Sequence, residues 1–174
     1  MWSTLRQIAR IGLPSEAPPE SDETLVVAAR LEARIRAVLG RALCIRAVDA
    51  GSCNGCELEI HALGNPLYNL ERLGMRFVAS PRHADLLLVT GPVSVAMEAA
   101  LKRTYAATPD PKLVVAVGDC GCTGGIFGES YASRGRVANV IPVDVAVPGC
   151  PPSPRQLLAG LLTAVGARAF SRDS

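Results

Sequence analysis

The cysteines are the residues of this chain whose types and spacing could support chemistry. The sequence of 174 residues contains six of them. Five lie in the short segments DAGSCNGCELE, VGDCGCTGG and VPGCPP, and these are Cys53, Cys56, Cys120, Cys122 and Cys150. The sixth, Cys44, lies inside an aliphatic run, where a cysteine usually behaves as a small hydrophobic residue. Five sulfur atoms are therefore candidates for one shared site.

The N-terminal sequence bears on the redox state of these thiols. MWSTLRQIARIGLP lacks the pattern of a secretory signal, because Arg6 and Arg10 interrupt its apolar residues. We therefore expect a cytoplasmic protein. Thiols stay reduced in that compartment, so clustered cysteines indicate metal binding or redox chemistry rather than disulfides.

The spacing of the cysteines separates two kinds of metal site. Four thiolates suit either tetrahedral zinc or an iron–sulfur cluster. Structural zinc sites commonly use two short C-x-x-C-like pairs, but here only Cys53 and Cys56 form such a pair, while Cys120 and Cys150 come from separate segments. The spacing therefore favours an iron–sulfur cluster. A zinc site, thiol redox chemistry and simple packing remain alternatives.

Glycines surround the same cysteines. A cluster held by four thiolates carries negative charge, and backbone N–H groups that approach the sulfurs tune it. Glycine permits that approach because it has no side chain, although each glycine also fits an ordinary turn. The glycines in question are Gly51, Gly55, Gly121, Gly124, Gly125 and Gly149.

Short aliphatic runs alternate with helical patterns along the chain. The sequence predicts strands at 43–48, 76–78, 86–90, 113–118 and 143–147, and helices at 24–39, 57–64, 68–74, 93–107 and 154–170. Gly40 is the expected stop of the first helix and Ser153 the expected N-cap of the last. This alternation predicts an α/β fold with a doubly wound sheet. Each cysteine segment follows a predicted strand, at the sheet edge where such folds bind ligands.

Composition and charge exclude several classes of protein. Hydrophobic residues make up 49% of the chain and charged residues 20%, which excludes general disorder. The net charge of +2 and the aromatic content of 4% do not indicate nucleic-acid binding. The most apolar stretch, residues 86–97, is shorter than the about 20 residues of a membrane-spanning helix.

The domain organisation is predicted as an N-terminal extension followed by one domain. Residues 1–41 comprise an amphipathic segment at 1–13, a proline-rich acidic linker at 14–23 and the helix at 24–39. The amphipathic segment fits either a contact with a partner or membrane surface, or a frayed terminal helix. Residues 42–170 form the domain that carries the cysteine segments.

The cysteine motifs resemble a known family. CNGCELE, GDCGCTGGIFG and VPGCPP, with SPRHADLLLVTGP between them, are similar to the small subunits of nickel–iron hydrogenases and to the 20-kDa, B-type subunit of NADH:quinone oxidoreductase (complex I). The resemblance covers residues 42–165. It implies a flavodoxin-like, mainly parallel sheet with helices on both faces and one [4Fe-4S] cluster. The ligands it implies are Cys53, Cys56, Cys120 and Cys150, whereas Cys122 occupies a position that the family does not use.

The first motif distinguishes the branches of this family. Complex I subunits have adjacent cysteines there, whereas Asn54 and Gly55 separate Cys53 from Cys56 here, as in hydrogenases. The short chain most resembles the small subunits of membrane-bound, energy-converting (group 4) hydrogenases, including formate hydrogenlyase complexes.

The resemblance also implies a role and partners. The chain would relay single electrons beside the active site of a hydrogenase-type large subunit, without bond-making chemistry of its own. The other implied partners are a ferredoxin-like iron–sulfur subunit and membrane-embedded subunits, which would hold the chain at the inner face of the cell membrane. A B-type subunit that passes electrons to quinone is the alternative within the family. A structural zinc or assembly protein is the alternative from another class.

Glu57 is the one candidate for proton transfer. It directly follows Cys56 and matches a glutamate that hydrogenases place near the proton route between subunits. The alternative is a carboxylate in the first turn of a helix, where the helix dipole favours negative charge.

Overall fold

The computed structural model describes Arg6 and residues 23–172. The amphipathic segment predicted at 1–13 lies outside the described residues, apart from Arg6. Residues 14–22 of the predicted linker also lie outside them, and its last residue, Glu23, begins the first helix. The helices are α2 (Glu23–Leu39), α3 (Gly55–Ala62), α4 (Val95–Ala107), α5 (Gly118–Thr123) and α6 (Pro154–Arg172). The strands are β1 (Leu43–Asp49), β2 (Met75–Phe77), β3 (Leu86–Thr90), β4 (Leu113–Val117) and β5 (Val145–Val147).

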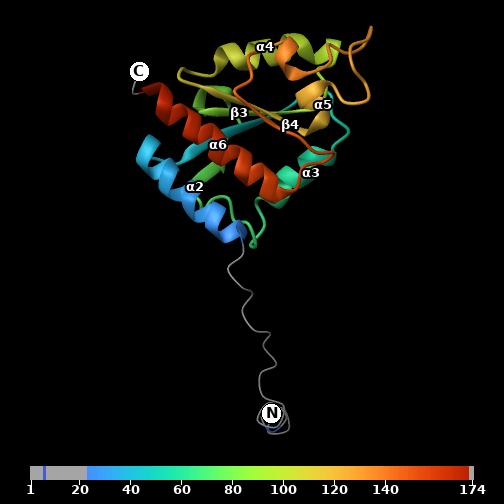
Figure 1. The fold of residues 1–174 in the computed structure, drawn as a ribbon. Helices are drawn as coiled ribbons and strands as arrows, with labels where there is room; N and C mark the ends of the chain where they lie inside the picture. The colour runs from blue at the N-terminus through green and yellow to red at the C-terminus, as the bar shows by residue number, and fades with distance from the viewer. Residues whose placement is uncertain (1–5, 7–22, 173–174) are drawn as a thin grey trace.

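The strands form one sheet in the order β2-β1-β3-β4-β5, and every neighbouring pair is parallel. Helices α2, α3 and α6 pack on one face, and α4 packs on the other (Figure 1). The chain order reverses between β1 and β3, as in doubly wound folds. The predicted α/β class and parallel sheet are confirmed.

The central strands are buried on both faces. All five residues of β3 and all five of β4 are buried. Leu86 and Leu88 pack against the core beneath α2 and α6, whereas Leu87 and Val89 pack against the core beneath α4. Each such side chain contributes about 1.5–3 kcal/mol of transfer free energy. This two-sided burial explains why β3 and β4 are near-continuous apolar runs in the sequence.

The helix ends follow the expected capping chemistry. Gly40, directly after α2, has φ +64, the left-handed conformation that ends many helices. The Ser94 hydroxyl accepts the Met97 N–H at 3.3 Å, so α4 begins two residues later than predicted. At α6, the Gln156 N–H donates to the Ser153 hydroxyl at 3.4 Å, and the Ser153 N–H donates to the Gln156 amide oxygen at 2.8 Å. The expected N-cap is confirmed as a capping box.

The helix predicted at 68–74 is wrong. This segment consists of successive turns between α3 and β2. Asn69 has φ +44, and the Asn65 side chain accepts two backbone N–H groups at 2.9 and 3.0 Å. Such local hydrogen bonds compete with helix formation. Leu70 and Leu73, which produce the helical spacing, are nevertheless buried in the core.

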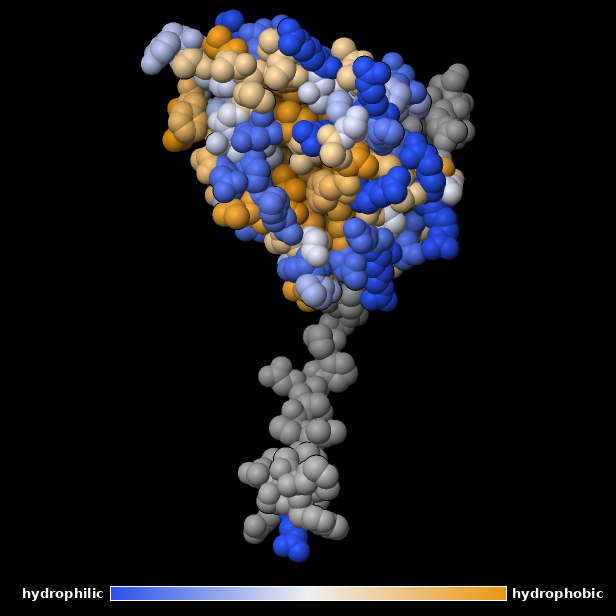
Figure 2. Space-filling model, turned by 180° about the vertical axis from the view of Figure 1, so that it is seen from behind, coloured by the Kyte–Doolittle hydropathy of each residue, from blue (hydrophilic) through white to orange (hydrophobic). Residues whose placement is uncertain are grey.

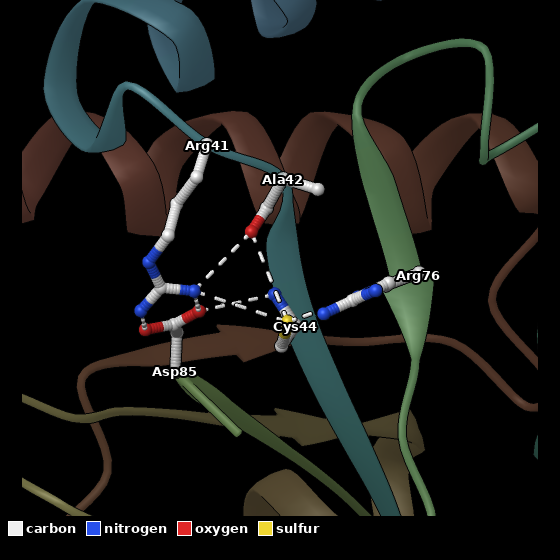
Figure 3. A network of polar contacts seen from close by, with 5 residues as sticks. All are labelled: Arg41, Ala42, Cys44, Arg76 and Asp85. Atoms are coloured by element: carbon white, nitrogen blue, oxygen red, sulfur yellow. Dashed lines mark hydrogen bonds and ion pairs between the residues drawn. The ribbon is translucent and has the colours of Figure 1, made fainter. Parts of the chain in front are cut away.

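A polar network joins the amino ends of three strands, β1, β2 and β3 (Figure 3). The side chain of Asp85 is only 7% exposed. Its carboxylate accepts hydrogen bonds from both terminal nitrogens of Arg41, at 2.9 and 2.7 Å, and from the Cys44 N–H at 3.1 Å. Arg76 on β2 donates to the Cys44 sulfur at 3.3 Å. Hydrogen bonding to Asp85 is the main cause that raises the pKa of Arg41. Cys44 is a buried strand residue, as predicted, and the structure places it at the amino edge of the sheet.

Within the part of the chain that the structure describes, no helix has both the length and the apolar composition to cross a membrane.

Some apolar side chains lie at the surface of the molecule. Figure 2, which views the molecule from behind, shows them gathered in the middle of that face among charged side chains. Leu67 and Ile126 are among the most exposed, at 77% and 93%.

Arg41→Ala tests the network at the amino edge. The substitution removes two charge-assisted hydrogen bonds from a buried carboxylate, so we expect a loss of about 2 kcal/mol in the free energy of unfolding. Arg36→Ala is the control, because Arg36 pairs with Glu32 on the surface of α2 and such pairs contribute about 0.5 kcal/mol or less. Urea unfolding of the two variants measures the difference. Equal losses of unfolding free energy in the two variants would mean that the Arg41–Asp85 pair stabilises the fold no more than an exposed ion pair does.

Candidate functional site

Three segments bring cysteines to the carboxyl edge of the sheet. Cys53 lies in the loop after β1, and Cys56 lies in the first turn of α3. Cys120 lies in α5, which directly follows β4, and Cys150 follows β5. Because the sheet is parallel, all of these segments leave it at the same edge.

The Cys56 sulfur lies within electrostatic reach of the other three sulfurs. The charges that act on the Cys56 thiol include those of Cys53, Cys120 and Cys150. Gly118 marks where the segments meet. A Cβ on Gly118 would lie 2.5 Å from the Cys56 sulfur and 3.4 Å from the Gly149 oxygen. The structure therefore brings together the four cysteines predicted as ligands.

Burial and nearby negative charge raise the pKa of two of these thiols. Burial, followed by repulsion from Glu57 and the other three cysteines, raises the pKa of Cys56 to about 12. Burial also raises the pKa of Cys120, with further contributions from Cys150 and Cys53. Four thiolates at this place therefore require a compensating positive charge, which a metal centre supplies while it displaces the protons.

Cys122 points away from the other cysteines. Residues two positions apart on a helix do not share a face, and α5 carries both Cys120 and Cys122. The Cys122 thiol donates to the Ala116 carbonyl at 3.6 Å and packs against the core beneath α4. Burial is the main cause that raises its pKa. The geometry separates Cys122 from the four-cysteine site.

The sequence predicts no helix at Cys120 and Cys122, so the helix α5 is a correction. Glycine has low helix propensity, so the sequence GDCGCT does not predict a helix. The helix begins immediately after the buried strand β4, with Gly118 at φ +80 making the turn. Tertiary packing therefore overrides propensity here.

Close approach to sulfur explains two of the glycines in these segments. A Cβ on Gly125, which has φ +54, would lie 2.8 Å from the Cys120 sulfur. Gly118, absent from the sequence-based set, makes the closest approach to a cysteine. Gly51, Gly121 and Gly124 face other groups, such as the oxygens of Pro92 and Val89 and the backbone of Gly128.

Glu57 is held between two hydroxyl groups. Ser52 in the loop after β1 donates to Glu57 Oε2 at 2.5 Å, and Thr90 at the end of β3 donates to Glu57 Oε1. Asp49, which the sequence patterns do not single out, orders the same loop by accepting the N–H groups of Gly51 and Ser52 at 2.8 and 2.7 Å. Glu57 therefore bridges the first cysteine loop to the neighbouring strand, beside Cys56.

The geometry is not that of a site closed around one ion. Among Arg6 and residues 23–172, no three His, Cys, Asp or Glu side chains form a group that could hold a single metal ion. Two of the four cysteines, Cys53 and Cys150, are exposed, while Cys56 and Cys120 are partly buried. The four thiols thus form an open site at the protein surface, whose donor set fits an iron–sulfur cluster.

Comparison with known proteins gives relatives over most of the chain. Formate hydrogenlyase subunit 7 of Escherichia coli is 43% identical over 155 residues, which cover 89% of this chain but only 59% of that protein. The probable membrane-bound hydrogenase subunit mbhJ of Pyrococcus furiosus is 48% identical over 139 residues, 78% of this chain and 83% of that protein. The B-type subunit of the NADH-quinone oxidoreductase of Heliobacterium modesticaldum is 46% identical over 108 residues, 62% of each chain.

A solved structure has the same fold. A chain of the membrane-bound sulfane sulfur reductase, an archaeal respiratory membrane complex, superposes with a TM-score of 0.65 at 33% identity, covering 86% of this chain and 77% of that one. The family model described as NADH ubiquinone oxidoreductase, 20 Kd subunit, matches residues 53–164, which include all four cysteines of the site. The chain therefore belongs to the family of the 20-kDa subunit of NADH:ubiquinone oxidoreductase.

Proposed function

We propose that this chain is an electron-relay subunit that holds one [4Fe-4S] cluster on Cys53, Cys56, Cys120 and Cys150. The observation that carries the proposal is the meeting of four thiols from three segments at one sheet edge, with Cys122 turned into the core. When bound, such a cluster accepts and donates single electrons. The chain's own part is to hold the four thiolates and to keep one side of the site open for a partner.

The complex we propose is a membrane-associated hydrogenase of the formate hydrogenlyase or energy-converting type. The C-x-x-C form of the first motif and the relatives named for formate hydrogenlyase and membrane-bound hydrogenase support it. The proposed partners are a hydrogenase-type large subunit, a ferredoxin-like iron–sulfur subunit and membrane-embedded subunits. Through them the chain would sit at the inner face of the cell membrane.

A second candidate is a subunit that passes electrons to quinone. The relative from the NADH-quinone oxidoreductase of Heliobacterium modesticaldum supports it. Identification of the large subunit that copurifies with the chain separates the two. Four cysteines that bind nickel and iron in that subunit support the hydrogenase, and their absence supports the quinone-reducing complex.

A projecting loop beside Cys120 supports the docking of a large subunit. Directly after Gly125, Ile126 is 93% exposed and Phe127 is 55% exposed, and Tyr131 is 99% exposed. Hydrogen bonds hold this loop to the ends of neighbouring elements, including Arg134 N–H to the Val93 oxygen at 2.7 Å. Large apolar side chains held outward by a braced loop are typical anchors of a protein interface.

Metal analysis of cysteine variants tests the ligand set. Cys120→Ser removes a proposed ligand and should abolish the cluster, whereas Cys122→Ser should leave it intact because that thiol faces the core. Anaerobic iron and sulfide analysis with EPR of the reduced protein measures this, with about four irons per wild-type chain expected. The opposite pattern for the two variants would overturn the assignment, and zinc in place of iron would favour the structural alternative.

Glu57→Gln tests proton transfer. We propose that Glu57 carries protons between the Ser52 and Thr90 hydroxyls and the partner's active site, so the amide should slow turnover of the complex about 100-fold. Glu59→Gln, two residues further along α3, is the control. Both variants should keep wild-type iron content and EPR signals. Unchanged turnover in Glu57→Gln would leave this residue only a structural role.

The docking loop is tested by a pair of apolar-to-polar changes. The double variant Ile126→Ser, Phe127→Ser should weaken binding of the large subunit about 100-fold, since buried interface anchors contribute about 2 kcal/mol or more. Leu67→Ser is the control. Leu67 is also well exposed, at 77%, but it follows the C-terminal end of α3, the end opposite to Cys56. Affinity between separately purified subunits measures the effect. Equal affinities for the double variant and the control would remove the loop from the interface.

A further inference from the structure

We propose that Asp119 is a positioning residue of the cysteine site, which clamps the Cys150 segment against α5. The inference rests on the proposed function, because the group positioned is the proposed cluster. Asp119 directly precedes Cys120, and its partner Gly149 directly precedes Cys150. A contact between these two residues therefore acts on the spacing of two cysteines that are 30 positions apart in the sequence.

The clamp consists of two reciprocal hydrogen bonds. The Gly149 N–H donates to the Asp119 carboxylate at 2.8 Å, and the Asp119 N–H donates to the Gly149 carbonyl at 2.8 Å. One aspartate thus satisfies both backbone groups of the residue before Cys150. Hydrogen bonds to a carboxylate are stronger than those between neutral groups.

The sheet itself does not hold these two segments together at this point. The paired register of β4 and β5 ends at Val117 and Val147. The next residue on one side is Gly118, which turns the chain at φ +80, and on the other side it is Pro148, which has no N–H to continue the ladder. The Asp119–Gly149 pair is therefore the first backbone link beyond the sheet.

The Cys150 segment has little freedom once it is clamped. Gly149 has φ +138, and a Cβ there would lie 2.6 Å from the Pro152 Cα, so the chain turns too tightly for another residue. With Gly149 fixed to Asp119, this turn fixes Cys150 relative to Cys120. The carboxylate also adds negative charge beside Cys120, so its loss should raise the reduction potential of a cluster held there.

The same strand pair provides a matched control at its other end. The Val114 N–H donates to the Asp144 carboxylate at 2.7 Å, and the Asp144 N–H donates to the Val114 carbonyl at 2.9 Å. Asp144 therefore makes the same reciprocal contact between the segments of β4 and β5, at the amino edge and away from the cysteines. A purely structural aspartate should behave as Asp144 does.

The test compares three variants of the full chain with reconstituted iron. Asp119→Ala should release iron to a chelator at least about tenfold faster than wild type, whereas Asp144→Ala should lower the unfolding temperature but release iron at the wild-type rate. Asp119→Asn keeps an oxygen that accepts the Gly149 N–H, so it should retain the cluster and raise its reduction potential. Equal iron release from the two alanine variants, or loss of the cluster from Asp119→Asn as fast as from Asp119→Ala, would overturn the proposal.

Amide hydrogen exchange separates this inference from the proposed function. In the metal-free chain, the Gly149 N–H should exchange about tenfold faster in Asp119→Ala than in wild type or Asp119→Asn. Unchanged exchange would overturn the clamp, whatever metal the site binds. A wild-type chain that binds no iron but shows the predicted exchange pattern would instead refute the cluster and leave the clamp in place.

Discussion

The parallel direction of β1, β4 and β5 is the constraint on which the cysteine site depends. Parallel strands send every following segment out at one edge, so cysteines separated by almost a hundred positions can meet without any direct contact along the chain. Parallel strands are joined by crossover helices, and these helices cover both faces of β3 and β4, which are apolar on each side. Placement of the site is thus a consequence of how the core is covered.

Charge determines what such a site can do. Cys56, whose pKa is about 12, sits with three other thiols and the Glu57 carboxylate in one partly buried place. Without a cation this arrangement holds protons, and with a metal centre it becomes a set of negative ligands. The hydroxyls of Ser52 and Thr90 accommodate the Glu57 charge in the same region. This combination fits the proposed electron relay, with Glu57 as the proposed proton site.

The sequence predicts the parts of the fold that depend on burial and capping. The apolar runs of β3 and β4, the glycine after α2 and the capping serine of α6 all have local signals. The prediction fails where side chains or tertiary contacts override such signals: Asn69 breaks a helical pattern, and α5 forms in a glycine-rich segment. Asp49 does have a local signal, since an aspartate two residues before a glycine suits an Asx turn, but the patterns used for the prediction leave it out. The role of Asp119 has no signal in the sequence, because its partner Gly149 lies 30 positions away and meets it only in the folded chain.

Helix α5 explains why Cys120 and Cys122, only two positions apart, have different surroundings. It starts directly at the end of β4, so one of its sides faces the sheet edge and another faces the core beneath α4. Cys120 lies toward the first and Cys122 toward the second, since two positions along a helix amount to a large rotation about its axis. The short helix therefore turns Cys120 toward the proposed cluster site and gives Cys122 a place in the core.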